Sequence, residues 1–364
     1  MANQFITVKD FARAALPRLM EHLVFPNLIY KDYSADFASV KGDTVQVRKP
    51  VVFTAGEFDQ EKGVSTHDIV ESTVDVTLDK IATVDVGIEA LQGATSMDDI
   101  TRLFIEPAAA ALAQKINQDG LMLYQDVGAC VGEAGKTPAS LSDFAAARKQ
   151  LNVNKAPVSG RCAVWDPEAD AAFTALDPIV HADKCGNTQA LREGAIGRVM
   201  GMDNYMTQAV KLHESGTMSG TVTVDGAHEK GAKALKIKGA SGMLKKGDIL
   251  KVGAYSFAVQ QDVDLSAVQT VPVTCEIPAL NGGESVELVG SHTANMAFHP
   301  MAFAFVTRPL TAPGGVESYT TTFNGVSLRV VRGYDMKYKK EMLSMDVLYG
   351  FKTLYPELAV RVLG

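Results

Sequence analysis

The stretch NMAFHPMAFAFVTRPL, residues 295–310, decides how the chain is divided. It resumes an α/β pattern of short apolar strands and helices that fills residues 138–212 and then breaks off. In between, from about 215 to 291, the composition shifts to Gly, Lys and β-branched residues. We expect strands there at 217–224, 233–238, 248–252, 254–260, 268–275 and 285–289. Short strands at regular spacing predict a small all-β unit, a barrel or sandwich, inserted into the middle of another domain.

The α/β pattern on either side of this insertion has recognisable starts and ends. Ser140 is a good N-cap for a helix that extends to about residue 151. Asp166 is an N-cap followed by a first-turn proline, which predicts a helix over 167–176. Strands are predicted at 161–165 and 196–203 before the insertion, and at 326–332 and 342–350 after it.

A long helix precedes this region. Ser96 is its N-cap, and apolar residues recur at helical spacing to about Val127. At 1.5 Å per residue, a helix of about 30 residues is about 45 Å long. Pro107 lies inside it, so we expect a kink or a break there. Such a helix would serve as the spine of a flat subunit.

Two alternating stretches, 44–52 and 72–80, flank a polar segment that contains glycine and runs from Gly56 to Asp68. This pattern predicts a long β-hairpin with a charged tip. Its strands carry charged residues at many alternate positions, so an isolated hairpin would bury little surface and be marginally stable. We therefore expect the hairpin to lie on a neighbouring subunit.

Residues 1–40 carry an amphipathic stretch, followed by Pro17 and Pro26, which interrupt regular helix. The segment is interpreted as an arm with short helical pieces and not as a domain.

The composition is that of an ordinary globular chain of 364 residues, with 46% hydrophobic residues and a net charge of −7. No apolar run approaches the roughly 18 residues of a membrane span, and the N-terminus has no secretion signal. We expect the protein to stay in the cytoplasm where it is made. Acidic and basic residues are interspersed, so no basic face for nucleic acid is predicted. The four cysteines contain no C-x-x-C pair, which argues against a zinc ribbon or a disulfide framework.

Motifs that carry chemistry are incomplete. Residues 132–137 imitate the end of a phosphate-binding loop, but Cys130 replaces the first glycine of that pattern. Residues 262–266 imitate the start of a calcium loop, but Ala267 replaces the turn glycine. His181 and Cys185 lack further metal ligands, and a structural role is favoured for both. We predict no catalytic residues, no metal and no cofactor.

The order of these parts resembles the tailed-phage coat proteins with the Hong Kong 97-type fold, and within them the branch with an inserted β-barrel domain. The residues that carry the resemblance are Asn3-Gln4-Phe5 with Pro26-Asn27-Leu28, residues 104–108 of the predicted long helix, and residues 295–310. The resemblance implies an α+β fold. Its parts would be an N-terminal arm (1–41), an extended hairpin loop (42–82), a peripheral domain (83–137) with a spine helix at about 96–127, an axial domain with return strands (138–214 and 292–364), and an inserted β-barrel-like domain (215–291).

The resemblance also implies a function. A major capsid protein of this kind is not an enzyme; it assembles with itself into pentamers and hexamers of an icosahedral shell, usually with scaffolding and portal proteins. The shell would be built in the host cytoplasm, form the virion capsid, and enclose DNA without sequence-specific binding and without a membrane. In the hairpin, Arg48, Glu57, Asp59, Glu61 and Lys62 are candidate contacts between subunits, although each could simply be a solvated charge. The alternatives are an encapsulin-like compartment shell and, less favoured, a hydrolase with an appended β domain.

Overall fold

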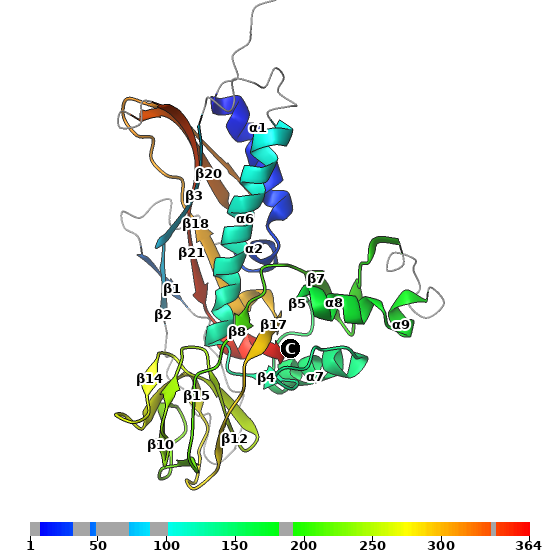
Figure 1. Ribbon diagram of the computed structural model, residues 1–364, viewed down its shortest axis with the longest axis vertical. Coiled ribbons are helices and arrows are strands. Elements are labelled where there is room, and N and C mark those ends of the chain that lie inside the picture. The colour runs from blue at the N-terminus through cyan, green and yellow to red at the C-terminus, as the bar shows by residue number, and fades with distance from the viewer. Residues whose placement is uncertain (1–7, 32–43, 49–72, 88–100, 182–191, 336–339) are drawn as a thin grey trace, which may run out of the picture.

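The computed structural model describes residues 8–31, 44–48, 73–87, 101–181, 192–335 and 340–364. The molecule is elongated (Figure 1), with two helices, α1 (Val8–His22) and α6 (Glu106–Leu121), side by side along its long axis against a sheet. A lobe with helices α7 (Leu141–Val153), α8 (Pro167–Thr174) and α9 (Asp177–Val180) extends to one side, and a unit of short strands forms one end.

The predicted spine helix is present over its described part. A π-helical segment, η1 (Thr101–Ile105), continues into α6 and then into a 3₁₀ segment, η2 (Met122–Asp126). The break expected at Pro107 is a change of helical geometry and not a gap, since the π-helical η1 ends at Ile105 and α6 begins at Glu106, one residue before the proline. One face is buried, through Ile105, Ala109, Leu112, Ala113 and Ile116.

The N-terminal segment differs from the predicted arm. Helix α1 runs through Pro17, and its apolar stripe is buried in the main core; the stripe consists of Val8, Phe11, Ala12, Ala15, Leu16 and Leu19. We attribute the continuous helix to this burial, which offsets the hydrogen bond lost at the proline. A short helix, α2 (Phe25–Leu28), follows. Buried Asn117 of α6 holds the connection, since its Oδ1 accepts hydrogen bonds from the Val24 and Phe25 amides and its Nδ2 donates to the His22 carbonyl.

The five-stranded sheet beneath α1 and α6 is antiparallel. Its order is β18 (Phe303–Thr307), β21 (Lys340–Thr353), β20 (Val326–Asp335) and β19 (Glu317–Phe323), and β3 (Lys80–Gly87) also pairs with β21. The strands predicted at 326–332 and 342–350 are confirmed. The strand predicted at 72–80 is wrong in extent, because the chain there forms β2 (Thr73–Thr77) and then enters this sheet as β3.

The seven-stranded sheet of the lobe is mixed. It contains β4 (Cys130–Val131), β22 (Ala359–Leu363), β17 (His292–Phe298), β5 (Arg161–Trp165), β7 (Met202–Met206) and β6 (Arg198–Val199) in that order, with β8 (Leu212–His213) beside β17. Trp165 is fully buried against Phe144 and Phe173 in the core of the lobe. The single strand predicted at 196–203 is two strands, because Met200 and Gly201 both have positive φ and form a tight hairpin turn.

The unit of short strands has a core of its own. Its strands are β9 (Thr223–Val224), β10 (Ala232–Lys238), β11 (Met243–Leu244), β12 (Ile249–Val252), β13 (Tyr255–Ala258), β14 (Val263–Asp264), β15 (Thr270–Ile277) and β16 (Val286–Leu288). All the buried members of one hydrophobic cluster lie between Val222 and Val286. Each of the six strands predicted here overlaps an observed one, and only the two-residue strands β11 and β14 were missed.

Candidate functional site

The base of the predicted hairpin is formed by β1 (Thr44–Arg48) and β2, which pair antiparallel from Thr44 opposite Thr77 to Arg48 opposite Thr73. Arg48 is therefore the last residue of the paired base. The other four candidate contact residues, Glu57, Asp59, Glu61 and Lys62, lie outside the described residues. The five candidates stay predictions.

The hairpin base is anchored to the face of the five-stranded sheet opposite α1 and α6. Val76 and Leu78 are buried there with Ala304, Val306, Leu348 and Leu354. Where β2 ends, the backbone of Thr77 crosses directly over Gly350 of β21, and a Cβ at position 350 would overlap the Thr77 carbonyl. The hairpin is thus set at a fixed place on the body by two apolar side chains and one glycine.

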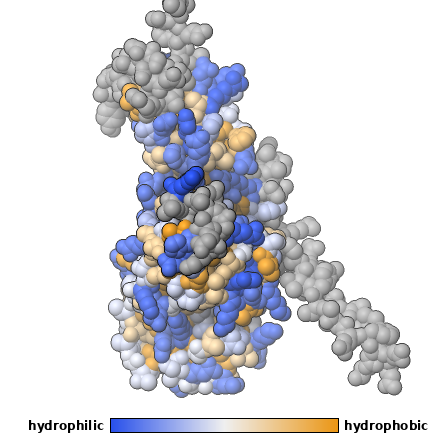
Figure 2. Space-filling model, turned by 90° about the vertical axis from the view of Figure 1, so that its right-hand side faces the viewer, coloured by the Kyte–Doolittle hydropathy of each residue, from blue (hydrophilic) through white to orange (hydrophobic). Residues whose placement is uncertain are grey.

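Exposed apolar side chains occur on the lobe. Val153, the last residue of α7, and Val158, which follows the helix, are 62% and 64% exposed, and Tyr205 and Met206 lie open at the end of β7. Figure 2, which faces the side of the molecule that carries the lobe, shows hydrophobic residues interspersed with hydrophilic ones on this face. Single exposed apolar residues are ordinary, so this surface alone does not identify a partner.

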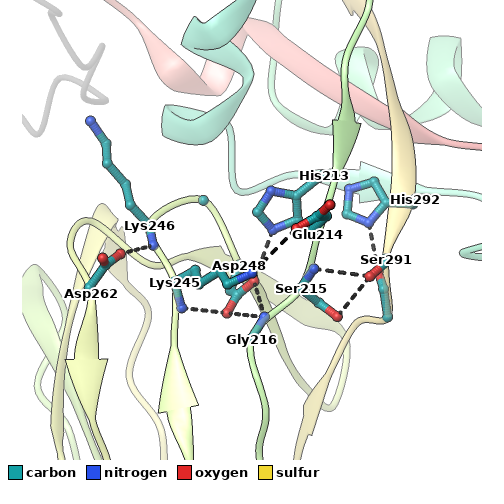
Figure 3. A network of polar contacts seen from close by, with 12 residues as sticks. His213, Glu214, Ser215, Gly216, Lys245, Lys246, Asp248, Asp262, Ser291 and His292 are labelled. Carbon is teal, nitrogen blue, oxygen red and sulfur yellow. Dashed lines mark hydrogen bonds and ion pairs between the residues drawn. The ribbon is translucent and has the colours of Figure 1, made fainter.

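The junction between the β unit and the body is a buried polar network (Figure 3). The two connecting segments run side by side, since His213 of β8 pairs with His292 of β17 and the Ser291 hydroxyl accepts a hydrogen bond from the Ser215 amide. His213 Nε2 lies 2.9 Å from Oδ1 of Asp248, and its Nδ1 lies 3.1 Å from the Tyr124 hydroxyl. Because a carboxylate only accepts, Nε2 is the N–H donor to Asp248, and Nδ1 shares the second hydrogen bond with the tyrosine hydroxyl.

Arg361 of β22 ties three parts of the molecule together. Its guanidinium is fully buried and donates to the carbonyls of Gly247 in the β unit and of Tyr124 and Val127 at the end of the spine. It also lies 4.9 Å from the centre of the Tyr124 ring, within cation–π range. One side chain of the C-terminal strand therefore contacts both the spine and the β unit.

The charges of the junction follow from its burial. Burial lowers the pKa of Arg361 to about 10, so it stays charged at neutral pH. Burial lowers the pKa of His292 to about 4, which keeps this ring neutral. The Nδ1 of His292 lies 2.8 Å from the Gly290 carbonyl and is therefore its N–H; Nε2 lies 3.4 Å from Nη1 of Arg361 and is the free acceptor.

Close backbone contacts reinforce the junction. A Cβ on Gly128 would lie 2.9 Å from the Ala258 amide, and one on Gly247 would lie 2.8 Å from Cγ of Gln125. Both glycines let the β unit approach the end of the spine more closely than another residue would allow. The arrangement is suited to fixing the orientation of two parts, and the buried His213 and Asp248 have almost no exposed surface through which a substrate could reach them.

The incomplete motifs have structural roles. Residues 132–136 form a turn after β4 beside the N-terminus of α7, where Ser140 and Asp143 form a capping box. A surface hollow of about 350 Å³ lies there, lined by Glu133, Lys136 and Thr137 among others. Asp262 and Asp264 of the imitation calcium loop accept hydrogen bonds from the backbone amides of Lys246 and Ser266. Within the described residues, no group of three His, Cys, Asp or Glu could hold a metal, and no helix is long and apolar enough to cross a membrane.

The residues of the junction were not identified from the sequence. Two signals were present. Arg361 is the only charged residue of the apolar run 358–363, which indicates a buried cation with partners. His213 and His292 each lie just outside the predicted insertion, so each marks one of its two connections.

Among known proteins, similarity to this chain is found at the level of the fold. No family model matches the chain. No curated protein matches it either. A solved structure from Mycobacterium phage Che8 is similar with a TM-score of 0.54 and 18% identity, over 93% of this chain and 90% of that one. Two further structures are less similar. They are a capsid structure of the cyanophage P-SCSP1u (TM-score 0.46, 11% identity, 89% and 84% covered) and a virus-like particle from Pyrococcus furiosus (0.43, 10%, 98% and 98%). The chain thus has a mixed α+β fold that it shares with the Che8 chain.

Proposed function

We propose that this chain is the major capsid protein of a tailed phage, with the Hong Kong 97-type fold, and that it acts by assembling with copies of itself into an icosahedral shell. Two observations support this. The chain combines a two-stranded hairpin base, a spine helix and two larger sheets, and its fold is shared along nearly the whole chain with a structure from a phage.

The observation that carries the proposal is the hairpin. Its base is fixed on the body through Val76, Leu78 and Gly350, while the paired strands β1 and β2 form a two-stranded sheet of their own. A two-stranded sheet with polar residues at alternate positions gains little stability within one subunit. We infer that residues 42–82 contact a neighbouring subunit, with Arg48, Glu57, Asp59, Glu61 and Lys62 as the candidate contact residues.

The proposed domains follow the two larger sheets. The five-stranded sheet with α1 and the spine corresponds to the peripheral domain and the return strands, and the seven-stranded sheet with α7 and α8 to the axial domain. Residues 215–291 are the proposed inserted domain, because they have a separate hydrophobic cluster. The exposed apolar residues of the lobe, among them Tyr205 and Met206, are where we expect axial domains to meet around a capsomer axis.

Assembly would proceed in the host cytoplasm through pentamers and hexamers, with scaffolding and portal proteins as partners. The finished shell would enclose DNA, held without sequence-specific contacts. In this role the chain is structural and not an enzyme. An encapsulin-like compartment shell is the remaining alternative within the same fold, and it would differ by its cargo.

A hairpin deletion tests the proposal. Arg48 and Thr73 lie directly opposite each other, so residues 49–72 can be replaced by an Asn-Gly turn that joins the two strands. We expect this variant to keep the circular dichroism spectrum of the full chain and to have a free energy of unfolding in urea within about 1 kcal/mol of it. We also expect it to remain unassembled. Assembly of the variant into particles like those of the full chain would contradict the proposed role of the hairpin.

A further inference from the structure

The junction holds a histidine whose only free acceptor nitrogen faces a buried cation. His292 is 1% exposed, its Nδ1 is occupied by the Gly290 carbonyl, and its Nε2 lies 3.4 Å from Nη1 of Arg361. A second proton on this ring can only go to Nε2, where it would point at the Arg361 guanidinium. The acceptor would be lost, and two positive charges would face each other in a buried site.

The groups around His292 could do little to stabilise a positive charge on its ring. Those that act on His292 directly are His213 of β8, Arg361 of β22 and Asp248 beside β12, and those that act on Arg361 include Tyr124 and Asp126 of η2 and Cys130 of β4. Asp248 is the only carboxylate among those that act on His292, and its two oxygens already accept hydrogen bonds from His213 and from the Gly216 and Lys245 amides. The carboxylate therefore cannot turn toward a protonated His292 without breaking those bonds.

The β unit can leave the body without losing its own core. Its buried cluster shares no member with the main cluster of the body, and its covalent connections are the two segments that meet at His213 and His292. Contacts across the junction are made by Arg361 with Gly247, by His213 with Asp248, by the close approach at Gly128, and by a small apolar cluster in which Ile249 and Val289 pack on Leu363 and Cys130. The two polar pairs lie closest to His292, because Nη1 of Arg361 is 3.4 Å from its Nε2 and the His213 ring centre is 5.3 Å from its own, so a proton on His292 would disturb both.

We propose that this junction is an acid-sensitive latch: a proton on Nε2 of His292 releases the β unit from the end of the spine and from β22, while the β unit and the body each stay folded. The inference is independent of the proposed shell, because it needs only one copy of the chain. In an assembled shell, the same event would free the β unit to change its position on each subunit.

Hydrogen exchange of the full chain, followed by mass spectrometry and corrected for intrinsic exchange rates, tests the latch. His292 has a pKa of about 4 in the closed form and an ordinary value near 6.5 when released. The open population at the junction should therefore rise about 30-fold between about pH 7.5 and pH 5. We expect this rise in peptides that cover 211–216, 245–249, 289–293 and 359–363. Peptides from β10 and α6 should keep their protection.

Variants separate the latch from general acid instability. His292→Asn cannot be protonated, so its junction peptides should exchange equally at both pH values. His181→Asn, at an exposed position, is the matched control and should respond as the unchanged chain does. Three results would overturn the proposal: no pH response at the junction in the unchanged chain, the same response in His292→Asn, or loss of protection in β10 and α6 together with the junction. The first and third need no variant, so they hold even if His292→Asn does not fold.

Discussion

Replacing Gly350 with alanine tests how the hairpin is held on the body. The new Cβ would overlap the Thr77 carbonyl and would lie 3.0 Å from the Thr77 carbonyl carbon and 3.3 Å from Cα of Leu78. All three atoms are backbone, so no side-chain rotation relieves the overlap. Gly350 does not have a positive φ, which leaves this overlap as the reason for glycine.

The structure can respond to the overlap in two ways. The response that costs less free energy sets the size of the destabilisation. A shift of β2 that keeps the hairpin in place is an overpacking change, which costs about 1–3 kcal/mol. Detachment exposes Val76 and Leu78, which are 0% and 5% exposed, at roughly 1.5–3 kcal/mol each. The strand shift costs less, so we expect Gly350→Ala to lower the free energy of unfolding by about 1–3 kcal/mol. The main core, which lies on the other face of the sheet, should remain.

Gly87→Ala is the matched control, because Gly87 lies in β3 of the same sheet and a Cβ there would have nothing within 4 Å. Urea unfolding of the unassembled chain gives the stability change, and sedimentation velocity gives the assembled fraction. Gly350→Ala should lose both stability and assembly, while Gly87→Ala should change the free energy of unfolding by less than about 0.5 kcal/mol and assemble normally. If the two variants behaved alike in both measurements, the reasoning about the anchor would be refuted.

Three other predictions concern the interior. Asn117→Ala leaves the Val24 and Phe25 amides without their acceptor and should lower the free energy of unfolding by roughly 2–4 kcal/mol in urea, whereas the exposed Gln114→Ala should be neutral; equal midpoints would contradict this. Burial raises the pKa of Cys162 to about 11, so native labelling by a thiol reagent near pH 8 should be at least about 100-fold slower than in urea; rapid native labelling of its peptide would refute the buried position. The folded-state pKa of His292 is below its unfolded value, so the unfolded chain binds the proton first and stability is lost as pH falls from 6.5 toward about 4. Between about pH 7.5 and pH 5 the loss from this ring is about 2 kcal/mol, and His292→Asn should reduce the measured pH dependence by that amount; an unchanged dependence would argue against it.

Local signals in the sequence predicted much of the fold. The capping box at Ser140 and the N-cap at Asp166 are short-range features, and both helices begin where these residues indicate. The strands of the β unit were predicted by alternation within a few residues. Pro17 was misleading, because packing of the α1 stripe against α6 and the sheet outweighs a local helix breaker, and no local pattern contains that contact.

The junction could not be assembled from the sequence for the same reason. The residues of the junction are far apart along the chain. His213, His292 and Arg361 meet because β17 pairs with both β8 and β22, whereas Tyr124 comes from η2 and Asp248 directly precedes β12. None has the fixed spacing of a motif. The hairpin base was predictable from alternation, but its anchor at Gly350 depends on where β2 crosses β21, which the sequence does not indicate.

Electron microscopy of the purified full chain, in negative stain, is the most direct test of self-assembly. The chain would be expressed alone and together with a candidate scaffolding protein, and sedimentation velocity would measure the mass of the particles. We predict closed shells, or tubes and sheets with a hexameric lattice, in at least one of these conditions. A chain that sediments as a monomer in every condition, and shows turnover of a substrate, would contradict the central claim.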